Sequence, residues 1–444
     1  MRRSGIAFGG VCAATAILWP CAVMAQDGGL QLTFGLENRL EVVGNDSLSV
    51  PATGTLVSNV TALSFGLTSE TQIDRLDFSA TGAAIVETGD GDTELDFGRA
   101  EVQFSYHREV PAAVLDLTAE MRSGGLDTFD ALTGADEPGT QTDYVLDGRI
   151  ETGRTSALGF GLGVGYSRTE YEDTVDPDLF DSTEARADAA VILRFSEIAT
   201  GRLGVRYSER EEEDPGTTVT QTMTTFVGLD YSVNERVDLS AELGYAEIET
   251  EEFGVIDRTT GPDFRLAATY DMPVGTASAL LRVSQDSDEG QRTTFEIGRE
   301  FEGPRDTIAA RLGVTRGDET GSDVVGSLSW DRTLPDGSIG IDLEREVGFD
   351  SEDDSEVDSS RISVNWLKNV SDVSSISLDI TYEQSDSSVE SVDQLTLGAG
   401  YSHRLTQDWS LDSGVGYRVR DDADGRARSP NLFVALSRDF QIRP

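Results

Sequence analysis

The chain has 444 residues, with 81 acidic against 35 basic side chains and a formal net charge of −46 at pH 7. This charge repels nucleic acid and anionic surfaces, so polyanion binding through a basic patch is excluded. No run of about 18 apolar residues follows residue 25, which argues against a membrane-spanning helix in the remainder of the chain.

The N-terminus has the pattern of a cleaved secretory signal peptide over residues 1–25. Arg2 and Arg3 precede an apolar run over 6–23, which ends in the small-residue motif Val23-Met24-Ala25. The alternative is an uncleaved membrane anchor, which the interrupted apolar run disfavours. Both cysteines fall in this segment, so the mature chain is expected to contain no disulfide and no thiolate metal site.

From residue 30 onwards, apolar and polar residues alternate with period two, which indicates strands rather than helices. The first segment has its apolar residues at Leu30, Leu32, Phe34, Leu36, Leu40 and Val42. At 158–166, the stretch LGFGLGVGY alternates large apolar residues with glycine. The pattern continues to 409–419 in about 22 segments (roughly 18 to 22), each near the ~9–11 residues with which a tilted strand crosses a bilayer.

Short and long connections alternate along the chain. Short ones such as 154–156 and 335–337 carry turn-forming residues, whereas long acidic ones fill 172–183, 249–262 and 346–360. This alternation is typical of a transmembrane antiparallel meander β-barrel with short periplasmic turns and long external loops. The alternative is a soluble sandwich or solenoid, which also alternates apolar and polar residues.

Aromatic residues gather near both ends of the expected strands, as bilayer interfaces select. One set lies near the loop ends and the other near the turn ends: Tyr166, Tyr207, Tyr245, Tyr382 and Tyr417, and Tyr231, Tyr270, Trp330, Trp366 and Tyr401. We therefore predict two aromatic girdles around an all-β barrel. Residues 26–444 are expected to form this single barrel domain without a plug, so energised uptake is not expected.

The pattern after residue 25 resembles that of Gram-negative outer-membrane β-barrel proteins, porin-like in outline. The last segment is similar to the insertion signal of that family, with Leu432, Val434 and Leu436 in alternation and Phe440 near the end. Four residues follow Phe440, whereas the family's last strand finishes on phenylalanine. The resemblance implies an integral protein of the bacterial outer membrane, in contact with its lipid and lipopolysaccharide and inserted by the barrel assembly machinery.

In such a barrel, the large residues of 158–166 face lipid and the glycines face the lumen. Either these glycines leave room for Arg149, Glu151, Arg186 and Asp188 of neighbouring strands, or they relieve curvature. Five arginines are expected on one inner wall: Arg186, Arg194, Arg202, Arg206 and Arg210. They could form a ladder for the carboxylate or phosphate groups of a solute, or balance acids of the lumen.

The longest connection, 123–143, carries Leu126, Phe129 and Leu132 among polar residues. It is the candidate for a loop folded into the pore, and an external loop with a small apolar patch is the alternative. The two histidines, His107 and His403, are well separated, and without cysteine they make no zinc site. We therefore expect no enzyme, no metal site and no cofactor.

These features together predict passive passage of ions or small hydrophilic solutes, with a cation preference that comes from the acidic loops. An export port for a secreted polysaccharide is one alternative, and a non-conducting structural or adhesive surface barrel is another. No nucleic-acid partner is expected, and the pattern favours neither a monomer nor an oligomer.

Overall fold

The computed structural model describes residues 29–89, 92–125, 139–174, 179–287, 290–318, 321–350, 355–387, 391–423 and 425–442, so the expected signal peptide lies outside it. These residues form 22 antiparallel strands in one sheet. The strands are β1 (Leu30–Gly44), β2 (Thr55–Glu70), β3 (Asp74–Gly89), β4 (Asp92–Val110), β5 (Ala113–Gly125), β6 (Thr140–Thr152), β7 (Leu158–Glu172), β8 (Ser182–Ser196), β9 (Ala199–Glu212), β10 (Thr218–Asn234), β11 (Val237–Glu252), β12 (Val255–Asp271), β13 (Thr276–Gln285), β14 (Gln291–Glu302), β15 (Asp306–Arg316), β16 (Ser322–Leu334), β17 (Gly337–Asp350), β18 (Ser355–Ser371), β19 (Ser374–Asp386), β20 (Ser391–Arg404), β21 (Trp409–Asp422) and β22 (Gly425–Ile442).

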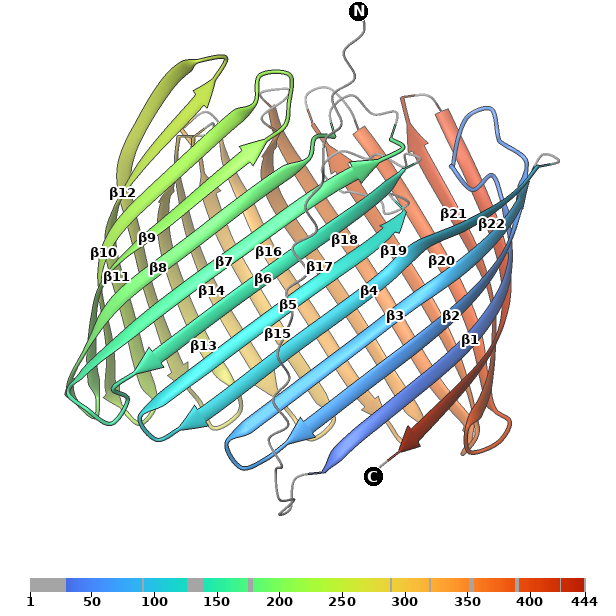
Figure 1. Cartoon of the computed structure of the whole chain (residues 1–444), viewed down its shortest axis with the longest axis horizontal. Coiled ribbons are helices and arrows are strands. Elements are labelled where there is room, and N and C mark those ends of the chain that lie inside the picture. Colours follow the sequence, from blue (N-terminus) through green and yellow to red (C-terminus); the bar gives the residue numbers. More distant parts are fainter. Residues whose placement is uncertain are drawn as a thin grey trace, which may run out of the picture.

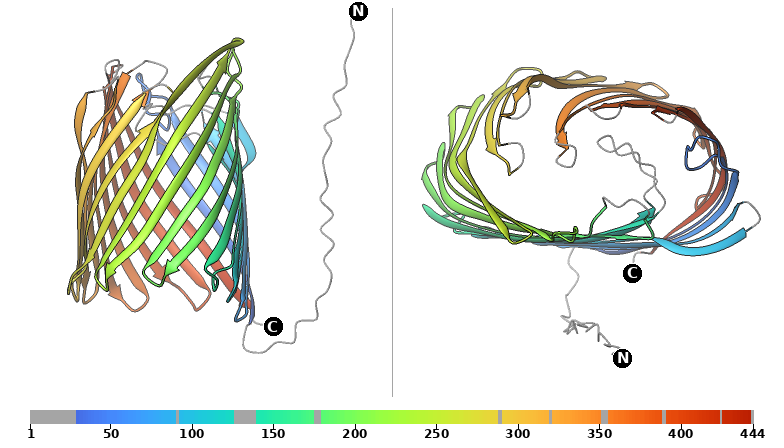
Figure 2. Two further views of the ribbon diagram at one scale, coloured as in Figure 1. Left: turned by 90° about the vertical axis from the view of Figure 1, so that its left-hand side faces the viewer. Right: turned by 90° about the horizontal axis from the view of Figure 1, so that it is seen from above.

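Each strand pairs with its neighbours in the chain, and the sheet closes on itself. The closing pair joins β1 to β22, with Leu32 opposite Ile442 and Val43 opposite Asn431. The result is the tilted barrel of Figure 1, whose cross-section is oval when seen from above in Figure 2. The predicted all-β meander barrel of about 22 strands is therefore confirmed. Within the described ranges, no helix is long and apolar enough to span a membrane.

The register decides which side chains share a face. Leu162 on β7 lies opposite Ile150 on β6, and both are exposed on the outer face. The next rung places Gly163 between Arg149 and Asp188, which face the lumen. Because side chains alternate with period two, this assignment holds along each regular strand.

Large apolar side chains cover the outer face of the barrel. Val164 is 65% exposed and Leu63 is 62% exposed, and similar values recur on most strands. In water such a continuous apolar surface would be unfavourable, whereas the hydrocarbon of a bilayer accommodates it. The wall is thus apolar outside and polar inside, opposite to a soluble sandwich.

Short connections lie at one end of the barrel, here the turn end, as at 153–157 and 335–336, and the other end is the loop end. The acidic segments at the loop end differ from expectation. In 249–262, β11 and β12 continue almost to the tip, and only Phe253 and Gly254 connect them. Both have positive φ, as in a two-residue hairpin turn.

The segment 346–360 is likewise mostly strand, because β17 ends at Asp350 and β18 begins at Ser355. The expected long loops at 249–262 and 346–360 are therefore largely extensions of the barrel wall. The acidic composition suggested loops there. The strands nevertheless continue beyond the membrane, because pairing between them satisfies the hydrogen bonds of the backbone N–H and C=O groups. Of the three acidic segments expected as long loops, only 172–183 contains a longer connection, between Glu172 and Ser182.

Candidate functional site

The glycines of β7 make room for side chains of the two strands beside it. A Cβ on Gly163 would overlap Asp188 Oδ1, and one on Gly165 would lie 2.7 Å from Asp147 Oδ1. Arg186 on β8 approaches Asp147 on β6 to 3.7 Å across the glycine strand. The first of the two expected roles therefore fits, because neighbouring side chains fill the space above the glycines.

The five arginines expected on one inner wall all have lumen-facing positions on β8 and β9, and each lies within 4.0 Å of a carboxylate. The pairs are Arg186 with Asp147 (3.7 Å), Arg194 with Glu151 (2.6 Å), Arg202 with Asp230 (2.7 Å), Arg206 with Glu242 (2.7 Å) and Arg210 with Glu212. This pairing favours charge balance within the wall over a ladder for solute anions.

Arg206 has the densest surroundings of the five. Besides Glu242, it stacks on the ring of Phe226, with 4.0 Å between the guanidinium carbon and the ring centroid. Phe226 is only 7% exposed although its position faces the lumen. Asp188 lies directly opposite Arg206 in the ladder. This group ties β8, β9, β10 and β11 together on the inner side.

The ten aromatic residues expected in girdles all occupy outward-facing positions. Tyr207 lies opposite Met223, and Tyr231 lies opposite Leu239, both exposed apolar neighbours. At the turn end, the indole N–H of Trp330 donates to Asp306 Oδ1 at 3.2 Å. An apolar ring with its polar edge turned away from the membrane suits an interface. The girdle function itself stays a prediction.

Phe440, the expected insertion signal, lies on the outer face of β22 opposite Phe34 of β1. The guanidinium of Arg438 sits over its ring, 4.1 Å from the centroid, and 5.1 Å from the ring centroid of Trp409. Contact with two aromatic faces compensates part of the cost of placing this arginine on the apolar side.

Leu126, Phe129 and Leu132, the candidates for a pore-constricting loop, lie outside the described residues. A different connection, 45–54 between β1 and β2, packs on the inner wall at the loop end (Figure 2). There Leu48 is 3% exposed, and Arg418 of β21 donates to the carbonyl of Asp46 at 3.0 Å. The sequence gives little sign of this packing, because Leu48 lies in a short connection without strand alternation.

The hairpin of β17 and β18 also reaches over its neighbours at the loop end. Arg292 on β14 donates to the carbonyl of Val347 on β17 at 2.8 Å, past β15 and β16. Val357 on β18 is fully buried. The backbone N–H of Gly321 donates to Glu356 Oε2 at 3.3 Å. Through Arg292 the hairpin is therefore anchored to β14, which is not its partner in the sheet.

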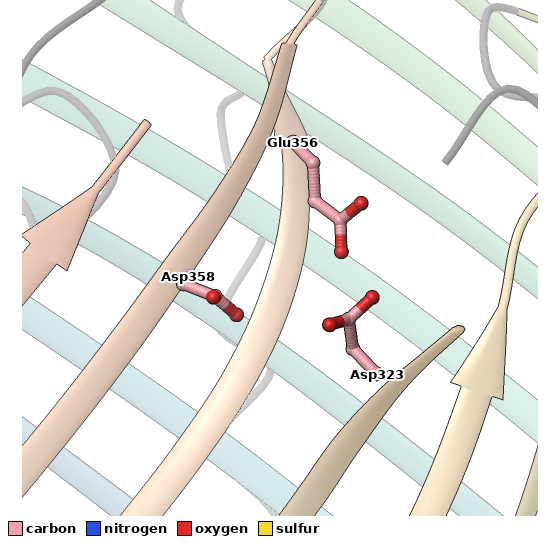
Figure 3. Close-up of side chains that lie close together, drawn as sticks. All are labelled: Asp323, Glu356 and Asp358. Atoms are coloured by element: carbon pink, nitrogen blue, oxygen red, sulfur yellow. The ribbon is translucent and has the colours of Figure 1, made fainter. Parts of the chain in front are cut away.

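Three carboxylates meet at this hairpin, as Figure 3 shows: Glu356 and Asp358 of β18, and Asp323 of β16. One oxygen atom of each lies within 4.8 Å of those of the other two. Burial raises the pKa of Glu356, and a hydrogen bond with Asp323 raises it further. Glu356 lies well beyond Ile362, the residue opposite the outward-facing Tyr382, and so outside the apolar band.

A trough follows the inner wall from β1 to β8, and we call it the inner-wall trough. It consists of two cavities of about 600 and 290 Å³ that share Thr118 and Asp147. The larger is lined by the hydroxyl or amide side chains of Thr33, Thr68, Ser79, Gln103, Ser105 and Thr118 and by the carboxylates of Asp77, Glu120 and Asp147. The smaller adds Asp116, Arg149, Arg186 and Asp188.

The histidines stand apart from each other. His107 Nδ1 lies 2.6 Å from Asp116 on the lumen side, and His403 Nδ1 lies 2.8 Å from Ser374 Oγ on the outer side. Across the described part of the chain, the three carboxylates of Figure 3 are the one set of three possible metal ligands close together.

No protein-family model matches the sequence, and no curated protein is similar to it. Solved structures, however, superpose on nearly the whole chain. The ferric-catecholate import receptor Fiu from E. coli K12 has a TM-score of 0.60 at 10% identity, over 94% of this chain and 82% of that one. The FrpB iron transporter from Neisseria meningitidis has a TM-score of 0.56 at 7% identity, over 94% and 83%. The copper transporter OprC gives 0.57 at 12%, over 93% and 80%.

The chain is an integral outer-membrane β-barrel protein. Its closed 22-strand wall and the large apolar side chains on the outer face of that wall fit this assignment. At these identities the similarity establishes the fold alone. The similar structures are a receptor and two transporters.

The function expected from the sequence is wrong. Similar structures are import receptors and metal transporters, which supports neither a passive channel nor a polysaccharide export port nor a structural or adhesive barrel. Strand periodicity indicates only the wall of a barrel, and acidic composition indicates only its overall charge. They carry no information on what its lumen binds, so they could not separate a channel from a receptor.

Proposed function

We propose that the barrel takes up a small metal-containing solute across the outer membrane, through a binding step in its lumen. The observation that carries this proposal is a closed 22-strand barrel whose wall, charged inside and apolar outside, superposes on iron and copper transporters. All elements of the described residues are wall strands, so the solute would contact the wall itself.

Charge favours a cationic solute. The chain carries a net charge of −46, and the loop end holds Asp323, Glu356 and Asp358 close together. An acidic mouth raises the local concentration of cations and lowers that of anions, and salt screens both effects. Free metal cations and cationic complexes are therefore expected to compete better than anionic chelates.

Uptake tests the proposal directly. The full chain would be expressed in a Gram-negative host without its own metal receptors, and cell-associated iron and copper measured against external concentration. We expect accumulation that saturates and that weakens at high salt, because binding limits the flux. Vector-only cells provide the background. Accumulation that rises linearly without saturation, or that matches the background, would contradict the proposal.

A further inference from the structure

We infer that Arg438 is the centre of a phospholipid-binding site on the lipid-facing wall, at the turn end of β21, β22 and β1. The group that it binds is the phosphate of a headgroup in the leaflet next to the periplasm. The site lies outside the lumen, so it goes beyond the proposed uptake function and does not depend on it. Four features support it: the outward position of Arg438, its unused donors, the contrast with other basic residues and the apolar wall beside it.

The first feature is the position of Arg438 on the outer face. In the register it lies between Trp409 of β21 and Leu36 of β1, and Leu36 is exposed on the lipid side. Trp409 is the first residue of β21, so Arg438 lies where this strand meets the turn 405–408, at the lower edge of the wall in Figure 1. Aromatic and basic side chains at a strand end lie at the depth of the headgroups, and the short turns of such barrels are periplasmic. The leaflet on that side consists of phospholipid.

The second feature is that the protein leaves the donors of Arg438 unused. The rings of Phe440 and Trp409 contact its guanidinium, but a ring face attracts the charge and accepts none of the N–H groups in the guanidinium plane. Among the described residues, no acceptor hydrogen bonds to this side chain and no carboxylate pairs with it, although its Nε is buried. A phosphate accepts two parallel N–H bonds from a guanidinium and brings the opposite charge. It therefore supplies both partners that the protein lacks here.

The third feature is the contrast with other outward-facing basic residues at the turn end. Arg332 and Lys368 each follow an outward-facing tryptophan by two residues, and they lie 3.6 and 3.8 Å from a carboxylate. Arg299 donates to a backbone carbonyl at 2.7 Å. A carboxylate beside a basic group repels phosphate and weakens its attraction to that group. Compared with these three residues, Arg438 is the one that has only aromatic rings as partners.

The fourth feature is the apolar wall beside Arg438. The next outward-facing rung toward the loop end pairs Leu411 of β21 with Leu436 of β22, and Leu436 is exposed on the outer face. A lipid whose phosphate lies on Arg438 would place its acyl chains over these side chains, which suit hydrocarbon. The site thus offers contacts to a headgroup and to its chains together, and it favours a phospholipid over free phosphate.

Native mass spectrometry of the refolded full chain in detergent tests the site, with phosphatidylglycerol as the probe. We expect saturable binding of one lipid molecule that is tighter than the binding of further copies. Diacylglycerol, which has the chains without the phosphate, should not bind in this way. Glycerol 3-phosphate, which has the phosphate without the chains, should not displace the lipid at equal concentration. Equal binding of diacylglycerol would overturn the inference, and so would displacement by glycerol 3-phosphate, which would indicate a site for free phosphate.

The decisive variant is Arg438→Gln, which removes the charge and the paired N–H donors. We expect about tenfold weaker binding of the first lipid, in line with the loss of a hydrogen bond between charged groups. Arg332→Gln is the matched control, because Arg332 also faces outward at the turn end near a tryptophan but is neutralised by Asp306. It should change the affinity less than about twofold, since screening weakens distant charges.

Equal effects of Arg438→Gln and Arg332→Gln would overturn the inference, because binding would then reflect the overall positive charge at the turn end. Folding of each variant is checked by its heat-dependent electrophoretic mobility. If Arg438→Gln does not fold, Arg438→Lys tests the same site, since lysine keeps the charge but lacks the planar pair of donors and the stacking on the rings. We expect binding several-fold weaker than that of the unchanged chain, and an unchanged affinity overturns the inference.

Discussion

Arg194 on β8 and Glu151 on β6 form an ion pair of 2.6 Å although the whole of β7 lies between them. The pair closes over Gly159, whose missing side chain leaves the passage open. Arg194 Nη1 also donates to the carbonyl of Gly153 at 2.9 Å in the neighbouring turn. In most sheets, side chains pair with those of the adjacent strand. Here the glycines of β7 allow a side chain of β8 to pair with one of β6, two strands away.

This geometry predicts opposite outcomes for two glycine substitutions on β7. In Gly159→Ala, the new Cβ would lie 2.6 Å from Arg194 Nη1 and 2.8 Å from a backbone carbonyl. We expect the free energy of unfolding to fall by about 2 kcal/mol, the value of a charged hydrogen bond. In Gly161→Ala, the Cβ meets only Ile192 Cδ1 at 3.9 Å. That control should be neutral or slightly stabilising, because alanine restricts the unfolded chain.

Urea unfolding of the two variants in the same detergent measures both effects. Equal stabilities would show that Arg194 adapts without loss and that the glycines serve curvature instead. Solvent screens the ion pair of Arg194 only in part, because the side chain of Arg194 is only 23% exposed, so we still expect the two stabilities to differ.

Arg206 should matter more to stability than other lumen arginines. Arg206→Gln removes the partner of Glu242, whose side chain is 19% exposed, and the cation on the ring of Phe226. We expect a loss of about 2 kcal/mol in the free energy of unfolding, because a half-buried carboxylate is left without its arginine. Arg311→Gln is the control, since Arg311 is exposed and, within the described ranges, its side chain donates only to Ser327. A similar loss in both would contradict a special role for Arg206.

The sequence predicts the wall of this barrel better than its two ends. Period-two alternation identifies the outer face of strands such as β7, because every second side chain must suit lipid. The partner of each arginine depends on register, so the reach of Arg194 to Glu151 could not be predicted. The inner-wall trough could not be predicted either. Its serines and threonines are ordinary strand residues in the sequence, and only the register of the paired strands brings them together.

The prediction of long acidic loops at the loop end was wrong for a different reason. Acidic runs such as 249–252 are typical of loops when the chain is read locally, yet pairing with 255–258 keeps them in strands. The packing of the connection 45–54 is likewise tertiary, without a local pattern: Asp46 accepts from Arg418 of β21, and Asn45 donates to the carbonyl of Arg428 on β22. The function was harder still to predict, because channels and receptors share the same alternation of apolar and polar residues.

Phe440 should affect insertion more than stability. If Phe440 is the insertion signal that the sequence predicts, Phe440→Ala should lower the amount of folded barrel in the outer membrane several-fold. Phe34→Ala is the matched control, since Phe34 lies directly opposite on the same face and loses the same apolar area. Heat-modifiable barrel in isolated outer membranes is the measure. Equal losses would show that lipid contact, not a terminal signal, explains the effect.

Glu356 should make the β17–β18 hairpin sensitive to pH. Its pKa is raised in the folded chain, so the folded state binds this proton more tightly than the unfolded one. The hairpin therefore becomes more stable as pH falls through the raised pKa, and the gain is complete below the ordinary value of 4.5. The protonated carboxyl can then share its hydrogen with Asp323 instead of repelling it.

Hydrogen exchange of the β17 and β18 amides at the loop end measures this effect, after correction for intrinsic rates. We expect protection to increase as the pH falls from neutral through the raised pKa and to level off below 4.5. Glu356→Gln keeps a neutral side chain at every pH and should remove the dependence. Glu252→Gln, at the loop end of β11, should leave it intact. A dependence that survives in Glu356→Gln would assign the effect to Asp323 or Asp358 instead, since both lie in the same cluster.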